Sequence, residues 1–307
     1  MPKLNVSRSI EINAPQSKVF EVLSDYHHWR PWSPWLIQEP EATNTVSEDG
    51  KFNEWEGRRA GTGNMKIIEE KSNEFLKMDL TFLKPWKSEA MVEFHLQPTE
   101  DGTRVLWKMD SSLPFFLFWM KSLMQELIGM DYDRGLNMLK EYVEEGKVHS
   151  KLEFVGFNEF PGYTYVGIRS SAPMNQMDVS MGRDFGKLHQ INEQHKDLIS
   201  GVPFSIYHKW GIKDNQVQYT AGLPLKSVPD QLGSEFISGS IPATKVYTLR
   251  HIGPYTHLGN AWSTMESLKR SKDFKVKRGL HPFETYENDP QDVDEKDLIV
   301  DIHFPVR

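Results

Sequence analysis

The sequence contains no cysteine, which excludes disulfide bonds, thiolate metal sites and cysteine nucleophiles. It also has no apolar run close to the ~20 residues that a helix needs to cross a bilayer, so we expect no membrane span. Residues 1–12 alternate like a strand and lack the continuous apolar segment of a signal peptide. Together these absences lead us to expect a soluble, cytoplasmic protein.

Basic charge is scarce relative to acidic charge. The chain has 36 lysines and arginines against 43 aspartates and glutamates, a net charge of −7. The first 150 residues hold 18 basic and 24 acidic side chains, and the remaining 157 hold 18 and 19. Neither half has the cationic excess that binding to a phosphate backbone requires, so nucleic acid is not an expected partner.

Signatures of cofactor and metal chemistry are missing as well. There is no Gly-x-Ser-x-Gly elbow, Walker loop or dinucleotide fingerprint. Of the 11 histidines, His27 and His28 are adjacent, and His189 and His195 are six residues apart, which is not the spacing of helical zinc pairs. We therefore expect neither a cofactor nor a metal.

The length and composition predict two globular domains. The chain has 307 residues, more than a single core usually holds, with 38% hydrophobic and 26% charged residues. In the first half a strand over 4–12 precedes a helix that Pro15 opens. Short strands follow over 52–56, 63–70, 75–82, 88–98 and 103–110, and then a long helix over 116–145. A curved antiparallel sheet wrapped on a long helix leaves a cavity between the two.

Three short segments of this half carry a family resemblance: residues 12–15 (INAP), 19–20 (VF) and 29–35 (WRPWSPW). With the order of elements, they make residues 1–146 resemble the polyketide cyclase/START-like (SRPBCC) superfamily, which includes lipid carriers, cyclases and stress proteins. We therefore expect an α+β helix-grip domain over 1–148. Six tryptophans either line a cavity for a bulky apolar ligand or pack as ordinary core: Trp32, Trp35, Trp55, Trp86, Trp107 and Trp119.

The segment 114–120 (PFFLFWM) is very apolar but short. We interpret it as the buried start of the long helix. The alternative is a surface that touches a membrane or surrounds a ligand portal.

After a polar joint at 146–150 the pattern restarts. We expect strands over 152–157 and 164–169, a helix over 173–199, and strands over 204–210 and 217–225. A strand over 243–251, a helix over 255–269, and strands over 282–286 and 298–304 follow. The order strand–helix–strand–strand thus occurs twice. It predicts two helices on one face of an antiparallel sheet, with a groove between the halves.

Three motifs of the second half resemble those of GyrI-like, or AraC-type effector-binding, domains. They are the segments 251–262 (HIGPYTHLGNAW), 282–290 (PFETYENDP) and 302–306 (IHFPV), in the order of the family. We therefore expect a GyrI-like effector-binding domain over 151–307. Many members follow a helix-turn-helix in transcription regulators, and the first half of this chain has no such motif.

Glu284 is the candidate ligand-binding carboxylate. Because side chains alternate along a strand, Glu284 and Tyr286 share one face. The resemblance implies that this glutamate lies in the groove among aromatic rings and meets cationic or polarised ligands. The alternative is an exposed glutamate on an edge strand. Further candidates for aromatic walls, each of which is otherwise a core residue, are Trp210, Tyr219, Tyr165 and Tyr247.

Three functions stay open at this point. The leading one is a binding protein that captures amphipathic or cationic aromatic small molecules in the C-terminal groove, with an apolar ligand in the N-terminal cavity. The second, which the resemblance also implies, is a hydrolase or cyclase of electrophilic, ring-strained compounds, with Glu284 as general base and Tyr286 as hydrogen-bond donor. The third is a regulator that acts through protein partners. Neither the ligand's identity nor the oligomeric state follows from the sequence.

Overall fold

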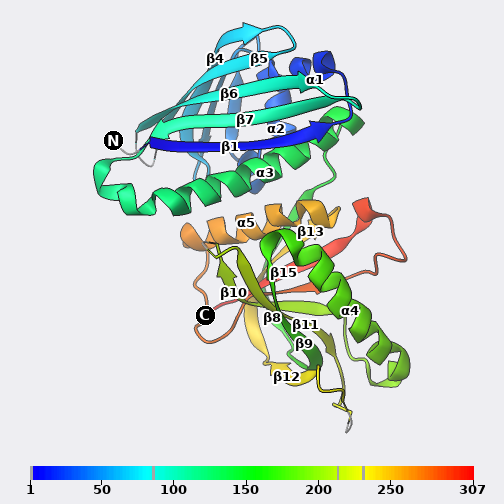
Figure 1. The fold of residues 1–307 in the computed structure, drawn as a ribbon. Coiled ribbons are helices and arrows are strands. Elements are labelled where there is room, and N and C mark those ends of the chain that lie inside the picture. Colours follow the sequence, from blue (N-terminus) through cyan, green and yellow to red (C-terminus); the bar gives the residue numbers. More distant parts are fainter. Residues whose placement is uncertain (1–2, 85–86, 213, 230–231) are drawn as a thin grey trace. The chain divides into compact units, whose positions relative to one another are not determined.

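The chain divides into two compact units, Met1–His149 and Ser150–Arg307. The computed structural model describes residues 3–84, 87–212, 214–229 and 232–307 (Figure 1). Each unit is an antiparallel sheet with helices, so the predicted α+β fold class is confirmed. Within the described residues, no helix combines the length and the apolar character that crossing a bilayer would require.

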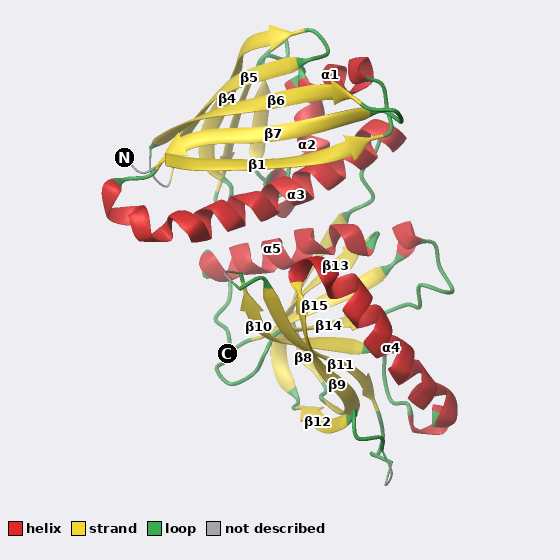
Figure 2. Cartoon of the chain, in the orientation of Figure 1, coloured by secondary structure: helices red, strands yellow, loops and turns green. Residues whose placement is uncertain are grey.

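The first unit is a seven-stranded antiparallel sheet in the order β1-β7-β6-β5-β4-β3-β2, with one long helix after its last strand (Figure 2). Strand alternation sets the sheet's two faces: along β7, the side chains of Thr103, Val105, Trp107 and Met109 are buried. The elements are β1 (Lys3–Ile12), α1 (Gln16–Leu23), α2 (Trp29–Trp32), β2 (Thr43–Val46), β3 (Phe52–Gly57), β4 (Gly61–Lys71), β5 (Phe75–Lys84), β6 (Ser88–Pro98), β7 (Thr103–Ser112) and α3 (Lys121–Glu145).

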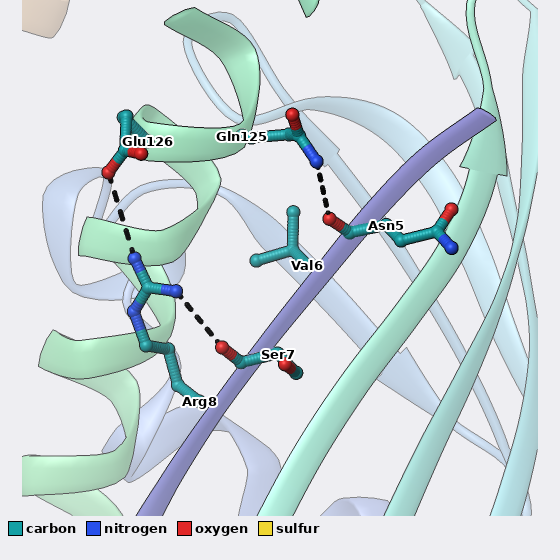
Figure 3. Close-up of a pocket in the computed structure, with 6 residues that line it drawn as sticks. All are labelled: Asn5, Val6, Ser7, Arg8, Gln125 and Glu126. Carbon is teal, nitrogen blue, oxygen red and sulfur yellow. Dashed lines mark hydrogen bonds and ion pairs between the residues drawn. The ribbon is translucent and has the colours of Figure 1, made fainter. Parts of the chain in front are cut away.

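Helix α3 protects the open edge of the sheet. Strand β1 pairs with β7 on one side only, and its carbonyl groups on the other side accept hydrogen bonds from side chains (Figure 3). Gln125 Nε2 donates to the carbonyl of Asn5 at 2.8 Å, and Arg8 donates to that of Ser7 at 2.9 Å. A polar cavity of about 240 Å³ lies among these residues. Because side chains bond to these carbonyl groups, fewer backbone acceptors of β1 remain free to pair with another strand.

Aromatic rings fill the interior where the sequence predicted a cavity. Trp107 stacks on Tyr132 of α3 with ring centroids 3.8 Å apart, and on Phe94 at 5.1 Å. Gly135 permits this approach, because a Cβ there would lie 2.9 Å from the Trp107 ring. Trp32 is buried against Trp107 at 5.8 Å. These tryptophans therefore pack as core.

The other predicted cavity tryptophans lie elsewhere. Trp55 packs edge-on against Phe82, Trp35 contacts the central cluster, and Trp86 lies outside the described residues. The predicted long helix begins later than expected, at Lys121, because Phe115–Met120 forms a 3₁₀ helix. The interpretation of this segment as a buried helix start is wrong for three side chains, which are 61%, 67% and 67% exposed: Phe116, Phe118 and Trp119.

The second unit is an eight-stranded sheet in the order β12-β9-β11-β10-β14-β15-β13-β8. The predicted duplication is confirmed, because β9-α4-β10-β11 and β13-α5-β14-β15 occupy matching places on either side of the β10/β14 pair. The elements are β8 (Lys151–Phe160), β9 (Tyr163–Pro173), α4 (Met177–Gln194), β10 (Phe204–Gly211), β11 (Gln216–Pro224), β12 (Ile237–Ile241), β13 (Thr244–Ile252), α5 (Leu258–Arg270), β14 (Phe283–Tyr286) and β15 (Ile299–Pro305).

Short links bring the two edges of this sheet near each other. Only two residues separate β8 from β9, and only two separate β12 from β13, although these strands lie at opposite ends of the strand order. The sheet must therefore curve. One of its faces carries an apolar cluster that includes Phe204 and Phe283. The opposite face carries α4 and α5 (Figure 1).

Candidate functional site

Glu284 lies on β14, a central strand, and its side chain is only 1% exposed. Three side chains donate hydrogen bonds to it. The hydroxyls of Tyr207 and Tyr286 both donate to Oε1, at 2.5 and 2.7 Å, and the indole N–H of Trp262 donates to Oε2 at 2.8 Å. The carboxylate is thus buried and held by three neutral donors.

The two tyrosines are equivalent positions of the duplicated unit. The segments 203–207 (PFSIY) and 282–286 (PFETY) align, and they pair so that Ser205 lies opposite Glu284. Their backbones bond reciprocally: Tyr207 N donates to Pro282 O, and Tyr286 N donates to Pro203 O, both at 3.0 Å. Since serine occupies the equivalent position in the first repeat, the site holds one carboxylate between two symmetric tyrosines.

Burial and hydrogen bonding act on Glu284 in opposite directions. Burial raises the pKa of its carboxyl, and the donors Tyr207, Tyr286 and Trp262 lower it by a smaller amount. Burial, together with the adjacent Glu284, raises the pKa of both tyrosines well above the usual value, so they stay protonated and donate. Among the described residues, no lysine, arginine or histidine forms an ion pair with Glu284.

Aromatic rings surround this carboxylate. Trp210 stacks on Tyr207 with centroids 5.0 Å apart and planes at 20°, and the edge of Trp262 meets the same tyrosine at 4.7 Å. Phe185 of α4 and Tyr255 contact Tyr286 edge-on, at 5.2 and 6.1 Å. Two of these rings reach the surface: Trp210 is 40% exposed and Tyr255 is 41% exposed. A ligand that touches the carboxylate must displace part of this cover.

The predicted site residues separate into two groups. Glu284, Tyr286 and Trp210 lie together. Tyr219 is buried under α4, where its hydroxyl bonds to Asp184 and Ser180, both at 2.7 Å.

The remaining two lie farther from the carboxylate. Tyr165 packs edge-on against Phe204, on the opposite face of the sheet from Glu284. Tyr247 is on β13, where it stacks on Phe274 and contacts Phe157.

Sequence reasoning missed Tyr207 and the role of Trp262. A visible signal existed for Tyr207: it follows Pro203 at the same spacing at which Tyr286 follows Pro282. Trp262 stands in one of the family motifs, but motif position alone does not tell a hydrogen-bond donor from a core ring. Phe185 and Tyr255 reach the site only through the packing of α4 and the turn before α5.

One group of side chains in the first unit has metal-ligand character. Glu141, Glu145 and His149 each place one ligand atom within 4.8 Å of the others. The His149 ring bonds to Glu145 at 3.1 Å, and its backbone N–H bonds to Glu141 at 2.9 Å. Exposed acidic groups are common without an ion, and here hydrogen bonds from His149 to Glu141 and Glu145 account for the arrangement.

Two family models match the chain. The model described as "GyrI-like small molecule binding domain" matches residues 154–307. The model described as "Polyketide cyclase / dehydrase and lipid transport" matches residues 3–144. No curated protein matches.

Solved structures resemble parts of the chain at low identity. The crystal structure of the EcmrR C-terminal domain is 18% identical, with a TM-score of 0.40, and the match covers 52% of this chain and 98% of that one. The cryo-EM structure of an EcmrR–DNA complex is also 18% identical, with a TM-score of 0.42, covering 63% and 72%. Protein MLL2253 from Mesorhizobium loti is 15% identical, with a TM-score of 0.36, covering 47% and 99%.

Proposed function

Because the chain belongs to the GyrI-like small molecule binding family over residues 154–307, and to the polyketide cyclase/dehydrase and lipid transport family over 3–144, we propose that it binds cationic or polarised aromatic small molecules at Glu284. The first unit takes no part in this proposal, since stacked aromatic rings occupy its interior. Nucleic acid takes no part either, because the net charge is −7.

The observation that carries the proposal is a buried carboxylate with neutral donors and no cationic partner among the described residues. Burying a charge is costly unless it is paired, and a bound cation would supply the missing pair. The rings of Trp210, Tyr207 and Trp262 offer π-faces that attract the same cation. Carboxylate and rings together favour a flat cationic ligand over a neutral or anionic one.

Trp210 is the side chain that we expect to open the site. It is the most exposed ring that stacks directly on a donor to Glu284, and its partner Tyr207 is held by the carboxylate. A ligand ring in its place would keep the stacking on Tyr207 and gain access to Glu284.

Glu284→Gln tests the proposal with little change of shape. The amide oxygen can accept from the Trp262 indole while the amide NH₂ donates to the two tyrosine oxygens, so the fold should persist. Calorimetric titration should compare a quaternary aromatic ammonium with its neutral carbon isostere. We expect the variant to lose about ten- to a hundredfold in affinity for the cation and little for the isostere, as a charge-assisted contact predicts.

The matched control is Glu295→Gln, which removes an exposed carboxylate of the same unit and should leave both affinities unchanged. Equal losses for the cation and its isostere in Glu284→Gln would make the glutamate structural. Unchanged affinities would mean that no ligand meets it.

A hydrolase is the second candidate, favoured by the raised pKa of Glu284. A carboxylate with a raised pKa is a better general base near neutral pH, and the Tyr286 hydroxyl lies beside it as a donor. In that case Glu284→Gln should abolish turnover of a neutral electrophilic substrate with little effect on its binding. If the unmodified protein bound the cation but turned over no substrate, the hydrolase would be excluded and binding would be the remaining function.

A further inference from the structure

A pocket in the GyrI-like unit differs in charge from the Glu284 site. It has a volume of about 270 Å³ and lies between the C-terminal half of α5, residues 276–282 and the end of β15. We propose that this pocket binds a small amphipathic anion: a compact apolar body that carries a carboxylate, sulfonate or phosphate group. This inference goes beyond the function proposed above, because it concerns a separate site with the opposite charge preference.

The floor and walls of the pocket are apolar. The apolar lining residues are the buried Phe304 with Val276, Leu280, Pro282 and Pro305; the others are Gly279 and the charged Glu266, Lys269, Lys277 and Arg278. A surface of this kind favours burial of an aliphatic or aromatic body. The volume is slightly below the ~300–1,000 Å³ typical of drug-sized ligands, so the ligand should be small.

The rim of the pocket is cationic. Lys269 is paired with Glu266, and its Nζ lies 5.8 Å above the Phe304 ring. Lys277 Nζ donates to the Thr244 hydroxyl at 3.1 Å, and Arg278 is exposed. Within the described part of the chain, neither Lys277 nor Arg278 has a carboxylate at ion-pair distance. Two uncompensated cations beside an apolar floor favour an anionic head group.

Backbone hydrogen bonds fix the segment that carries these cations. Lys277 N donates to Pro305 O at 2.8 Å, and Arg307 N donates to Lys275 O at 3.0 Å. Val276 forms an isolated β-bridge with Val306. The rim is thus built onto the end of β15, which limits the ordering that a ligand must impose.

The pocket is close to Glu284 and yet distinct from it. Its floor residue, Phe304, lies 5.8 Å from Trp262, the indole that donates to Glu284. None of the residues that line the pocket donates to Glu284. A negative ligand is repelled by Glu284 and attracted by the rim, so the two sites should select different compounds.

The concentration of basic residues in this segment is local. Residues 269–278 contain six lysines and arginines and one aspartate, in a chain whose net charge is −7. Three of the basic residues, Arg270, Lys272 and Lys275, do not line the pocket. They therefore provide a control for charge alone.

Titration calorimetry of the full chain with 2-naphthoate tests the proposal. We expect saturable binding to the unmodified protein and about tenfold weaker binding of the neutral 2-naphthamide. The double variant Lys277→Gln/Arg278→Gln should lose about ten- to a hundredfold in affinity for the naphthoate. Arg278→Gln alone, at an exposed position that cannot disturb the core, should lose part of it.

The matched variant Arg270→Gln/Lys275→Gln removes the same number and kinds of charge and should retain its affinity. If this variant lost as much affinity for naphthoate as the Lys277/Arg278 variant, the effect would come from net charge alone and the proposal would be overturned. Absence of saturable binding, or equal binding of naphthoate and naphthamide, would overturn it as well. Duplex DNA provides a further test at low salt. If it bound more tightly than naphthoate, and its binding depended on all four substituted basic residues, the segment would be a surface for polyanions and the proposal would be overturned.

Discussion

Glu284 is the residue on which the binding account depends, and its environment explains its chemistry. The tyrosine and indole donors favour the charged carboxylate, whereas burial favours the neutral acid and is the larger effect. With a raised pKa, Glu284 contributes stability that is present below its ordinary pKa and lost as pH rises through the folded value. A bound cation would reverse this preference.

The affinity for a cationic aromatic ligand should therefore increase with pH. As Glu284 ionises through its raised pKa, the cation gains its partner, whereas a neutral isostere gains nothing. Titrations at a series of pH values between weakly acidic and neutral would measure this, and Glu284→Gln should give a flat profile. An equally steep profile in the variant would assign the pH dependence to another group.

Strand alternation predicted that Glu284 and Tyr286 share a face, because that relation lies within one strand. It could not place Tyr165 relative to them, since the face of a side chain on β9 depends on the register through β11 and β10. Tyr207 comes from a different strand, and only the repeated Pro-Phe-x-x-Tyr spacing marks it in the sequence. Trp210 covers Tyr207 through tertiary packing, and such packing produces no local pattern in the sequence.

At the scale of the elements, His303 joins three central strands. Its ring on β15 bonds to Thr248 of β13 at 2.8 Å and to Thr285 of β14 at 3.0 Å. The Thr285 hydroxyl donates to Glu287 at 2.6 Å, so it is free to accept from His303 Nε2. Burial lowers the pKa of His303 to about 4, which favours the neutral imidazole in the folded chain.

The second unit should consequently lose stability in acid. The unfolded chain takes up a proton on His303 near its usual pKa of 6.5, whereas the folded chain does so only near about 4, so stability falls as pH drops through this window. The slope is at most about 1.4 kcal/mol per pH unit for one proton. Urea unfolding of His303→Gln should show a weaker decline between pH 6.5 and 4.5, and the exposed His189→Gln should match the unmodified protein. Identical declines in all three proteins would exclude His303 as the cause.

Long, regular elements were predicted well, and some short ones were missed. The strands of the first sheet have the alternation that burial imposes, and α3 has the helical spacing of its buried face. Strands β2 and β12 were missed because they have only four and five residues. A segment that short does not show a recognisable alternation of apolar and polar residues. The apolar sequence of Phe115–Met120 predicts a buried helix start, but hydrophobicity alone does not determine burial, and the segment forms a 3₁₀ helix with exposed rings.

At the scale of the whole molecule, each unit has its own sheet and its own core clusters. Residues 1–149 and 150–307, expressed separately, should each unfold cooperatively in urea. Differential scanning calorimetry of the two halves and of the full chain would measure this. If neither half gave a transition, the prediction of two independent domains would be wrong.

A crystal structure of the protein with a quaternary aromatic ammonium compound would show directly whether Glu284 meets the ligand. We predict that the cationic centre lies within about 6 Å of the aromatic rings of Tyr207 or Trp262 and beside the Glu284 carboxylate, with Trp210 displaced from its stack. A ligand bound elsewhere, with Trp210 still stacked on Tyr207 and Glu284 still covered, would contradict it.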